Sequence, residues 1–174
     1  MANRGLLVAA DVRARRVTLL RGTVARAGAT AARVVHLDAD APLPFAGVFD
    51  RVLVDAPCSG LGTLRRDPDI RWRREATDLA AYADAQAALL ARAAGVMAPG
   101  GRLVYATCSS EPEENDQVVD RFLATHPEFR QTDLAADLPP GLAPLIEAGR
   151  LRTLPFAHGL EAFFAAALVR AWRP

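Results

Sequence analysis

Two cysteines stand at matching points of this sequence, each directly after a run of apolar residues. Cys58 follows "RVLVDAP" and Cys108 follows "GGRLVYAT". A cysteine thiolate is a strong nucleophile, and a nearby helix N-terminus lowers the pKa of the thiol. Ser110 opens a capping-box pattern, which predicts such a helix just after Cys108. A single free cysteine is often only a small buried hydrophobic residue, but two at matching strand ends indicate a reactive dithiol site.

Acidic residues follow three of the predicted strands. Asp11, Asp38 and Asp55 each stand at the end of an apolar run. An acid at the end of an early strand commonly binds ribose hydroxyls in nucleotide-binding α/β folds, which suits Asp11. Asp38 suits a contact with adenine or ribose. The alternative for either residue is a cap on the following helix, and the sequence leaves both interpretations open.

A basic loop follows Cys58. It combines five arginines with Trp72, and such a cluster can bind phosphates and stack on a base. The alternative is a solvated loop that Asp67 and Asp69 partly neutralise. The histidines have no metal-ligand spacing, and the sequence has no zinc, P-loop or Ser-His-Asp pattern, so we expect no metal site. The five arginines are Arg65, Arg66, Arg71, Arg73 and Arg74.

Strands alternate with helices along the chain, which predicts a parallel α/β sheet. Ligands bind such sheets at the carboxyl ends of the strands, so we expect the three acids and both thiols on one rim. "APGG" at residues 98–101 is expected to break the chain, and "RLRTLPF" and "EAFFAAALVRAW" predict a final pair of strands. The other predicted strands cover residues 6–10, 33–37, 51–55 and 102–106, and the predicted helices cover 12–27, 77–97 and 110–123.

The composition is typical of a globular domain. The chain has 174 residues, of which 51% are hydrophobic and 24% charged, with a net charge of +1. No apolar run approaches the roughly 20 residues that cross a bilayer, and the N-terminus lacks a signal-peptide layout, so we expect no membrane association. Two cysteines do not make a disulfide framework, which favours a reduced, cytoplasmic setting. The low net charge means that any nucleic-acid surface must be local.

Three segments together resemble a known family. "DAPCSGLGTLRRDPDIRWRR", "GGRLVYATCSSEPEEN" and "RTLPFAHGLEAFF" are similar to motifs of the Fmu/Sun-type RNA (cytosine-5) methyltransferases, above all the bacterial 16S rRNA 5-methylcytosine enzymes. The resemblance spans nearly the whole chain. It implies a Rossmann-like class I methyltransferase sheet, mostly parallel with a C-terminal antiparallel strand pair. It also implies S-adenosylmethionine as cofactor and RNA, namely 16S rRNA, as partner.

The resemblance assigns roles to particular residues. Cys108 would be the nucleophile that adds to cytosine C6, and Cys58 would assist product release. Asp11, Asp38 and Asp55 would contact the cofactor, with Asp55 also near the target base. Addition of a thiolate at C6 makes C5 nucleophilic enough to take a methyl group, which explains why such chemistry needs a cysteine. The base must also leave any stack to reach the site.

The sequence departs from the family pattern in two places. The tail reads "GLEAFF", where the family usually has Asp-Gly before the paired phenylalanines. The family's first strand and glycine-rich cofactor loop are expected before Asp11, so residues 1–174 are interpreted as a partial methyltransferase domain that an upstream segment would complete. "APGG" does not replace this loop, because it precedes a strand. The alternative function is a catalytically inactive remnant that at most contacts RNA; a redox dithiol protein is disfavoured, since no Cys-x-x-Cys is present.

Overall fold

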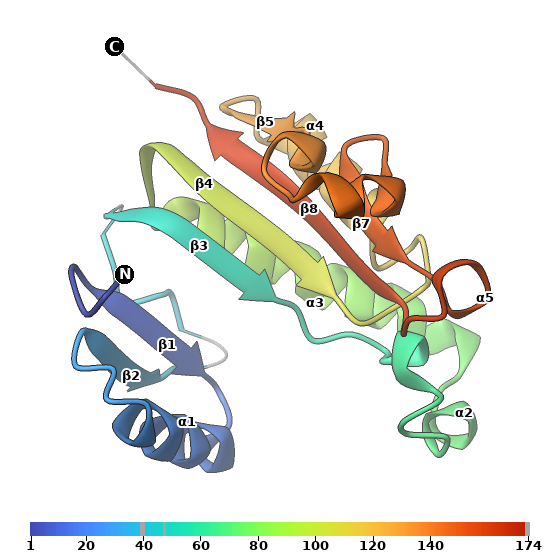
Figure 1. Cartoon of the computed structure of the whole chain (residues 1–174), viewed down its shortest axis with the longest axis horizontal. Coiled ribbons are helices and arrows are strands. Elements are labelled where there is room, and N and C mark those ends of the chain that lie inside the picture. The colour runs from blue at the N-terminus through green and yellow to red at the C-terminus, as the bar shows by residue number, and fades with distance from the viewer. Residues whose placement is uncertain (39–40, 47, 173–174) are drawn as a thin grey trace. The chain divides into compact units, whose positions relative to one another are not determined.

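The chain divides into two units, Met1–Pro44 and Phe45–Pro174, and each has a sheet of its own. Figure 1 shows the ribbon of this computed structural model, which describes residues 1–38, 41–46 and 48–172. Both units are built from the predicted alternation of strands and helices. Among the described residues, no helix is both long and apolar enough to cross a membrane.

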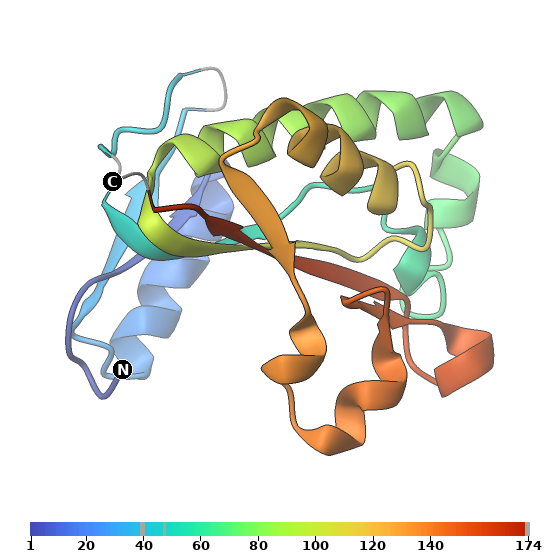
Figure 2. The ribbon, with the colours of Figure 1, turned by 90° about the horizontal axis from the view of Figure 1, so that it is seen from above.

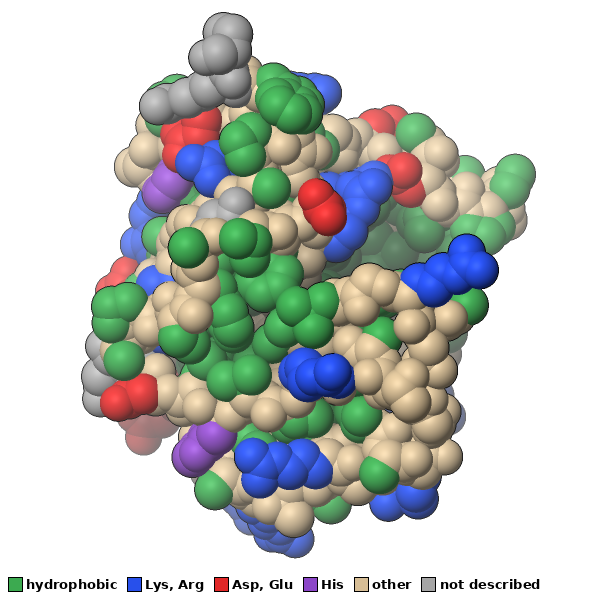
Figure 3. Space-filling model, turned by 90° about the vertical axis from the view of Figure 1, so that its left-hand side faces the viewer, with side chains coloured by type: hydrophobic (Ala, Val, Ile, Leu, Met, Phe, Trp, Pro, Cys, Tyr) green, Lys and Arg blue, Asp and Glu red, His purple; other side chains and the backbone are tan. Residues whose placement is uncertain are grey.

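The first unit is a strand–helix–strand motif. β1 (Leu7–Asp11) and β2 (Ala32–His36) pair in parallel, and α1 (Ala14–Arg26) connects them. The helix buries Val17 and leaves its arginines exposed. Gly28 follows it with a φ of 59°, a left-handed conformation that glycine adopts without strain. All three elements were predicted, with ends that differ by one or two residues. Figure 3 shows arginine side chains interspersed with apolar ones on one face of the molecule.

The second unit contains a mixed sheet of six strands. β3 (Phe49–Asp55) pairs in parallel with β4 (Met97–Thr107), and β8 (Phe163–Arg170) runs antiparallel to β4. The strand order is β3-β4-β8-β7-β6, and β5 also pairs with β8. The predicted final strand pair, β7 and β8, is confirmed and antiparallel. The remaining strands are β5 (Phe129–Thr132), β6 (Ile146–Glu147) and β7 (Arg150–Thr153).

Two long helices, α3 (Ala76–Gly95) and α4 (Asp116–Thr125), cover the same face of the second sheet, as Figure 2 shows. Glu75 and Asp78 form a capping box that fixes the start of α3. α3 packs on β3, β4 and α4, and α4 also contacts β5, and this burial of apolar surface stabilises the unit. The shorter helical segments are η1 (Leu61–Thr63), α2 (Ile70–Arg73), η2 (Leu134–Ala136), η3 (Pro140–Leu145) and α5 (Pro155–His158). Fully buried core residues include Leu90, Leu103, Tyr105, Val119 and Leu168.

The sequence prediction was wrong in two places in this unit. The helix expected from Ser110 begins only at Asp116, because the hydroxyl of Ser110 donates to the carboxylate of Glu111 instead of capping a helix. "APGG" does not break the chain, because it forms the first part of β4. Gly100 has a φ of 76°, and the pairing with β3 shifts register there, so the strand absorbs the extra residues as a bulge.

β3 forms one edge of the second sheet. Among the described strands it pairs with β4 alone, and β1 pairs only with β2. Leu53, in the middle of β3, is 69% exposed. An edge strand presents unpaired backbone N–H and C=O groups along its open side.

Candidate active site

Both cysteines lie just beyond the carboxyl ends of two neighbouring strands. β3 and β4 pair in parallel up to Asp55 and Ala106, and the amide of Ala56 continues the ladder by donating to the carbonyl of Ala106 at 2.9 Å. Beyond these residues the chain reaches Cys58 after β3 and Cys108 after β4. Their Sγ atoms lie 3.2 Å apart, and both thiols are free and half-buried. The predicted meeting of the two thiols is confirmed.

The two thiols ionise unequally because they share a hydrogen bond. The bond from Cys58 lowers the pKa of Cys108 to about 7, against the opposing effects of burial and of the Asp55 charge. The same bond, burial and the charge on Cys108 raise the pKa of Cys58 far above its ordinary value. The first proton therefore leaves Cys108, and Cys58 keeps its proton as a donor.

This cause differs from the one that the sequence suggested. A helix N-terminus beside Cys108 was expected to lower its pKa, but α4 begins only at Asp116. The field of a helix end falls off within about one turn, so it does not act on this thiol. The hydrogen bond from the thiol of Cys58 lowers the pKa of Cys108 instead. Nothing in the sequence gave the side-chain geometry on which that hydrogen bond depends.

Gly62 lets the two cysteine loops pack against each other. Its amide donates to the carbonyl of Cys108 at 3.0 Å, and its carbonyl accepts from the amide of Ala162 at 3.0 Å. A Cβ atom at this position would lie 2.2 Å from the Ala162 oxygen and 2.7 Å from the Cys108 oxygen. Real Cβ atoms do not approach backbone so closely. The glycine was expected to admit a ligand, but in the structure it admits the backbone of the other loop.

A buried carboxylate, that of Glu114, links the same two loops and was missed by the sequence analysis. Glu114 is fully buried, and its oxygens accept hydrogen bonds from Ser59, Ser109 and Gln86. Ser59 follows Cys58 and Ser109 follows Cys108. In the sequence Glu114 is one of three glutamates in "EPEEN", and nothing there distinguishes it from the other two.

Asp55 ends β3 with an exposed side chain. Its negative charge opposes ionisation of Cys108, which places the carboxylate within electrostatic range of the thiol. Its assignment to one site with the two cysteines stays a prediction.

The basic loop turns most of its arginines toward solvent. Arg65, Arg66, Arg71 and Arg73 are exposed, and Trp72 beside them is 83% exposed. Two weak ion pairs hold part of this charge, Arg66 with Glu161 at 3.7 Å and Arg73 with Asp69 at 3.5 Å. Exposed pairs of this kind are worth little, so the arginines stay available to another anion.

Arg74 behaves differently from the other arginines of this loop. It is half-buried, its Nε donates to the carbonyl of Ser59 at 2.9 Å, and its guanidinium lies 5.3 Å from the ring centre of Tyr82. Arg74 therefore supports the loop that carries Cys58. Its predicted role as a phosphate ligand gains no support from this position.

The first unit holds the other two predicted site residues. Asp11 accepts a hydrogen bond from the amide of Arg13 at 2.7 Å, a turn that ends before α1 and does not cap the helix. Asp38 lines a hollow of about 420 Å³ at the ends of β1 and β2, together with Val12, His36 and Leu37. Asp55 and both cysteines belong to the second unit. The predicted common rim for all five residues therefore stays a prediction.

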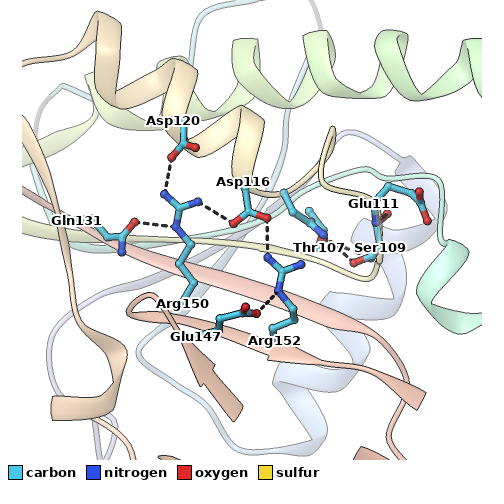
Figure 4. Close-up of polar contacts among 10 residues, drawn as sticks. Thr107, Ser109, Glu111, Asp116, Asp120, Gln131, Glu147, Arg150 and Arg152 are labelled. Atoms are coloured by element: carbon cyan, nitrogen blue, oxygen red, sulfur yellow. Dashed lines mark hydrogen bonds and ion pairs between the residues drawn. The ribbon is translucent and has the colours of Figure 1, made fainter. Parts of the chain in front are cut away.

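A second polar cluster joins α4 to β7 (Figure 4). Arg150 donates to Asp116 at 2.8 Å and to Asp120 at 2.5 Å, and its Nε donates to Gln131. Arg152 donates to Asp116 at 2.5 Å and pairs with Glu147. Burial opposes ionisation of Asp116, but the hydrogen bonds from the two arginines outweigh it and hold the pKa of Asp116 below its ordinary range.

No group of three or more His, Cys, Asp or Glu side chains suited to a metal ion occurs among the described residues. The histidines serve local contacts. His126 stacks on Phe122 with ring centres 4.1 Å apart, and His158 accepts the amide of Leu154 at 3.0 Å. The ring nitrogen Nε2 of His36 lies 3.0 Å from the carbonyl oxygen of Val12.

Comparison with known proteins gives this paired-cysteine site a family. The family described as 16S rRNA methyltransferase RsmB/F matches residues 1–169. The chain belongs to this family. It is 38% identical over 168 residues to the probable ribosomal RNA small subunit methyltransferase B of Bacillus subtilis (strain 168), covering 94% of the chain. It is 37% identical over 172 residues to the ribosomal RNA small subunit methyltransferase F of Serratia proteamaculans (strain 568), covering 97% of the chain.

Solved structures agree with this family assignment. The crystal structure of PH0851 matches with a TM-score of 0.86 and 36% identity, over 97% of this chain and 38% of that one. The crystal structure of NSun6 from Pyrococcus horikoshii with SFG matches with a TM-score of 0.79 and 25% identity, over 98% of this chain and 43% of that one. The predicted family and the Rossmann-like methyltransferase fold are confirmed.

The matched relatives are longer than this chain. It spans 37% of the length of the Bacillus subtilis protein and 36% of the Serratia proteamaculans protein. The paired-cysteine site lies within the matched portion, since the family match runs through residues 1–169.

Proposed function

We propose that this chain carries the catalytic cysteines of an S-adenosylmethionine-dependent methyltransferase that modifies C5 of a cytosine in 16S rRNA. The observation that carries the proposal is the pair of thiols 3.2 Å apart at the ends of two parallel strands, one of them with a pKa of about 7. The chain's family, 16S rRNA methyltransferases, supports the same conclusion.

Cys108 acts as the nucleophile in this proposal. A pKa of about 7 leaves a large fraction of Cys108 as thiolate at neutral pH. The thiolate forms a bond to C6 of the cytosine, and the electron pair of the C5–C6 double bond shifts into the ring. C5 then becomes the nucleophilic carbon. Asp55 lies close enough to affect the thiol and would hold the exocyclic amine and N3 while their charge changes.

Cys58 acts second, for a reason that lies in the coupling of the two thiols. Its pKa is raised first by the hydrogen bond to Cys108, then by burial and by the charge on Cys108. Once Cys108 is bonded to the base, its charge is gone and it no longer accepts that hydrogen bond strongly. The pKa of Cys58 then falls, so Cys58 can lose its proton and take the proton from C5. The electron pair of the C5–H bond restores the C5–C6 double bond as the Cys108 sulfur leaves C6.

The hollow in the first unit fits the adenosine part of the cofactor. Val12 and Leu37 offer apolar contacts for adenine, and the exposed carboxylate of Asp38 can accept ribose hydroxyls. Asp11 has one oxygen on the amide of Arg13, and its other oxygen lies 3.6 Å from Arg16 in a partly exposed ion pair that a ligand hydroxyl could replace. When bound, S-adenosylmethionine supplies an electrophilic methyl group on a sulfonium ion, which is the reagent that a nucleophilic C5 requires.

The exposed arginines of the basic loop would bind RNA phosphates, and Trp72 would stack on a base. This support comes from their position, since the loop begins directly after Cys58. The target cytosine must leave its stack to reach the thiols, and phosphate contacts on either side would hold the strand while it does so.

The test is a pair of cysteine variants in a preparation that methylates RNA. Cys108→Ala should abolish transfer of labelled methyl groups, because no bond to C6 can form. Cys58→Ala should instead accumulate a covalent RNA–protein adduct, visible as a shifted band on a denaturing gel, because the adduct forms but is not resolved. The adduct in Cys58→Ala should disappear when Cys108→Ala is added.

Two results would contradict the proposal. An adduct that accumulates in Cys108→Ala would exchange the two roles. Unchanged methylation in both variants would exclude covalent catalysis, and RNA binding without any methylation by the wild type would leave the inactive, RNA-contacting alternative.

A further inference from the structure

The carboxylate of Glu114 lies between the two cysteine loops, and it has no role in the chemistry proposed above. Its oxygen Oε1 accepts from the amide of Ser59 at 2.8 Å and from Nε2 of Gln86 at 3.0 Å. Its oxygen Oε2 accepts from the hydroxyl of Ser59 at 2.6 Å and from the hydroxyl of Ser109 at 2.5 Å. The side chain is fully buried.

All four donors come from elements that carry the site. Ser59 is the neighbour of Cys58 and Ser109 is the neighbour of Cys108. Gln86 belongs to α3, and it also donates to the carbonyl of Pro57 at 2.8 Å, so it holds the residue on the other side of Cys58. One carboxylate thus joins the loop of Cys58 to the loop of Cys108, and joins both loops to α3.

Four hydrogen bonds reach the carboxylate of Glu114. An amide N–H and a side-chain NH₂ group point at Oε1 and cannot reverse their direction. At Oε2 the two serine hydroxyls donate to the carboxylate and also accept a backbone amide, Leu61 to Ser59 at 3.3 Å and Glu111 to Ser109 at 3.1 Å. The hydroxyl oxygens of Ser59 and Ser109 lie 3.3 Å apart, so the two loops also contact each other directly at this point.

The backbone of Glu114 is fixed as well. Its carbonyl accepts the hydroxyl of Tyr105 at 2.6 Å, and Tyr105 is a fully buried residue of β4. The next residue, Asn115, donates to the carbonyl of Ser109 at 3.0 Å, and its Oδ1 accepts the hydroxyl of Thr107 at 2.5 Å. The carboxylate is therefore held on a rigid support, and it can set the position of the loops that bind it.

We propose that Glu114 is the positioning residue of the dithiol site: its buried carboxylate holds the Ser59 and Ser109 loops together and thereby sets the contact between Cys58 and Cys108. The inference rests on the proposed function for its catalytic meaning. Its physical content, the spacing of the two thiols, is measurable without any methylation.

A purely electrostatic role makes the opposite prediction for the nucleophile. The charge of Glu114 by itself raises the pKa of Cys108, but it is the weakest of the effects acting on that thiol, and the hydrogen bond from Cys58 is the strongest. If Glu114 acted only through its charge, neutralising it would lower the pKa of Cys108 further. If it positions Cys58, neutralising it weakens the hydrogen bond, and the pKa of Cys108 rises from about 7 toward its ordinary value.

The decisive variant is Glu114→Gln, which keeps the shape of the side chain and removes its charge. The amide oxygen can serve the two N–H donors, but its NH₂ group then faces two hydroxyls that must turn round. We expect the pKa of Cys108, measured from the pH dependence of its alkylation by iodoacetamide, to rise. We also expect diamide to oxidise Cys58 and Cys108 to a disulfide about tenfold more slowly, as one weakened positioning contact of about 1.4 kcal/mol implies.

Two further variants keep the test independent of how well Glu114→Gln folds. Ser59→Ala and Ser109→Ala each remove one hydroxyl from Oε2 and leave the charge in place. Both should slow disulfide formation and raise the pKa of Cys108, in the same direction as Glu114→Gln. A charge-only role predicts little change in either quantity for the serine variants.

The matched control is Asp116→Asn, which neutralises a carboxylate close by in the chain that binds Arg150 and Arg152 and no residue of the cysteine loops. It should lower the stability of the fold and leave both thiol measurements unchanged. The inference is overturned if Glu114→Gln lowers the pKa of Cys108, or if its disulfide rate equals that of Asp116→Asn. If the proposed function were wrong, the result would be different. Methylation would survive Cys108→Ala, and the thiol measurements on the Glu114 and serine variants would still follow the expectations above.

Discussion

Glu114 and Asp116 are two carboxylates on the same short stretch of chain, yet they are built into the molecule in opposite ways. Glu114 is fully buried, and neutral donors from two serines, a glutamine and a backbone amide satisfy it. The side chain of Asp116 is 30% exposed, and two arginines satisfy it. The first holds the cysteine loops together, and the second fastens α4 to β7.

The two carboxylates differ in what they do. Glu114 fixes the position of two loops through short hydrogen bonds from neutral donors, whereas Asp116 joins two elements through ion pairs. An arginine beside Glu114 would neutralise the charge but would also bring a cation next to the thiols. Neutral donors bind the carboxylate at short range and add no cation, so the hydrogen bond from Cys58 and the burial of the thiol remain the largest effects on the pKa of Cys108. In the Asp116 cluster no reactive group lies nearby, and each arginine has a second acid. Arg150 also binds Asp120 and Arg152 also binds Glu147, which makes that cluster tolerant of change.

The largest expected effect is on stability, from Glu114→Ala compared with Asp116→Ala. Removing the Glu114 carboxylate leaves four buried donors without an acceptor, and each buried unsatisfied group costs about 1–3 kcal/mol, so we expect a loss of at least about 3 kcal/mol. Asp116→Ala should cost about 1 kcal/mol, since both arginines keep another acid. Urea unfolding curves of the two variants measure this, and equal losses would contradict the comparison.

A second effect concerns the thiol pair that Glu114 positions. Cys108→Ala removes the hydrogen bond and the charge that raise the pKa of Cys58, leaving burial as the remaining cause. We expect the pKa of Cys58 to fall, with alkylation of Cys58 at pH 8 faster by up to about tenfold for each unit of the fall. Peptide mapping by mass spectrometry reports the site. Alkylation of Cys58 at the wild-type rate would show that the two thiols are not coupled.

The Asp116 cluster should reveal itself in acid. The pKa of Asp116 lies below its ordinary range in the folded protein, so its ion pairs stabilise the fold fully where the unfolded carboxylate is also ionised, above about pH 5. This stabilisation is lost as the pH falls through the folded pKa. The free energy of unfolding of Asp116→Asn should therefore differ from wild type at pH 7 and converge with it toward pH 2. A difference that persists at pH 2 would assign the effect to packing.

The smallest effect on stability is expected in the basic loop, where the arginines are exposed. Replacing Arg65, Arg66, Arg71 and Arg73 by alanine should change the free energy of unfolding by less than about 1 kcal/mol. The same variant should bind RNA with a flatter dependence of log affinity on log salt, by up to about 0.9 for each lost phosphate contact. An unchanged slope would show that these arginines do not bind RNA phosphates and belong to a solvated loop. Arg74→Ala is the contrast, because it should disturb the Cys58 loop instead.

Most of the fold could be predicted from local patterns. Apolar runs located β1, β2, β3 and the second half of β4, and helical spacing located α1 and α3, because these elements follow from side-chain periodicity. The short strands β5 and β6 carry too few residues for a period to show. The start of α4 was misplaced because Ser110, the expected cap, donates to Glu111 instead, and the helix begins only at Asp116.

The sequence by itself was enough to identify the family of this protein. The two cysteine motifs stand at fixed points after two strands, and parallel pairing of those strands was enough to predict that the thiols meet. Only the tertiary structure decided which groups control them. The hydrogen bond between Cys58 and Cys108, the turn of Arg74 toward Ser59 and the burial of Glu114 join residues far apart in the chain. Such contacts depend on how the elements pack against each other, and no local pattern of residue types encodes that packing.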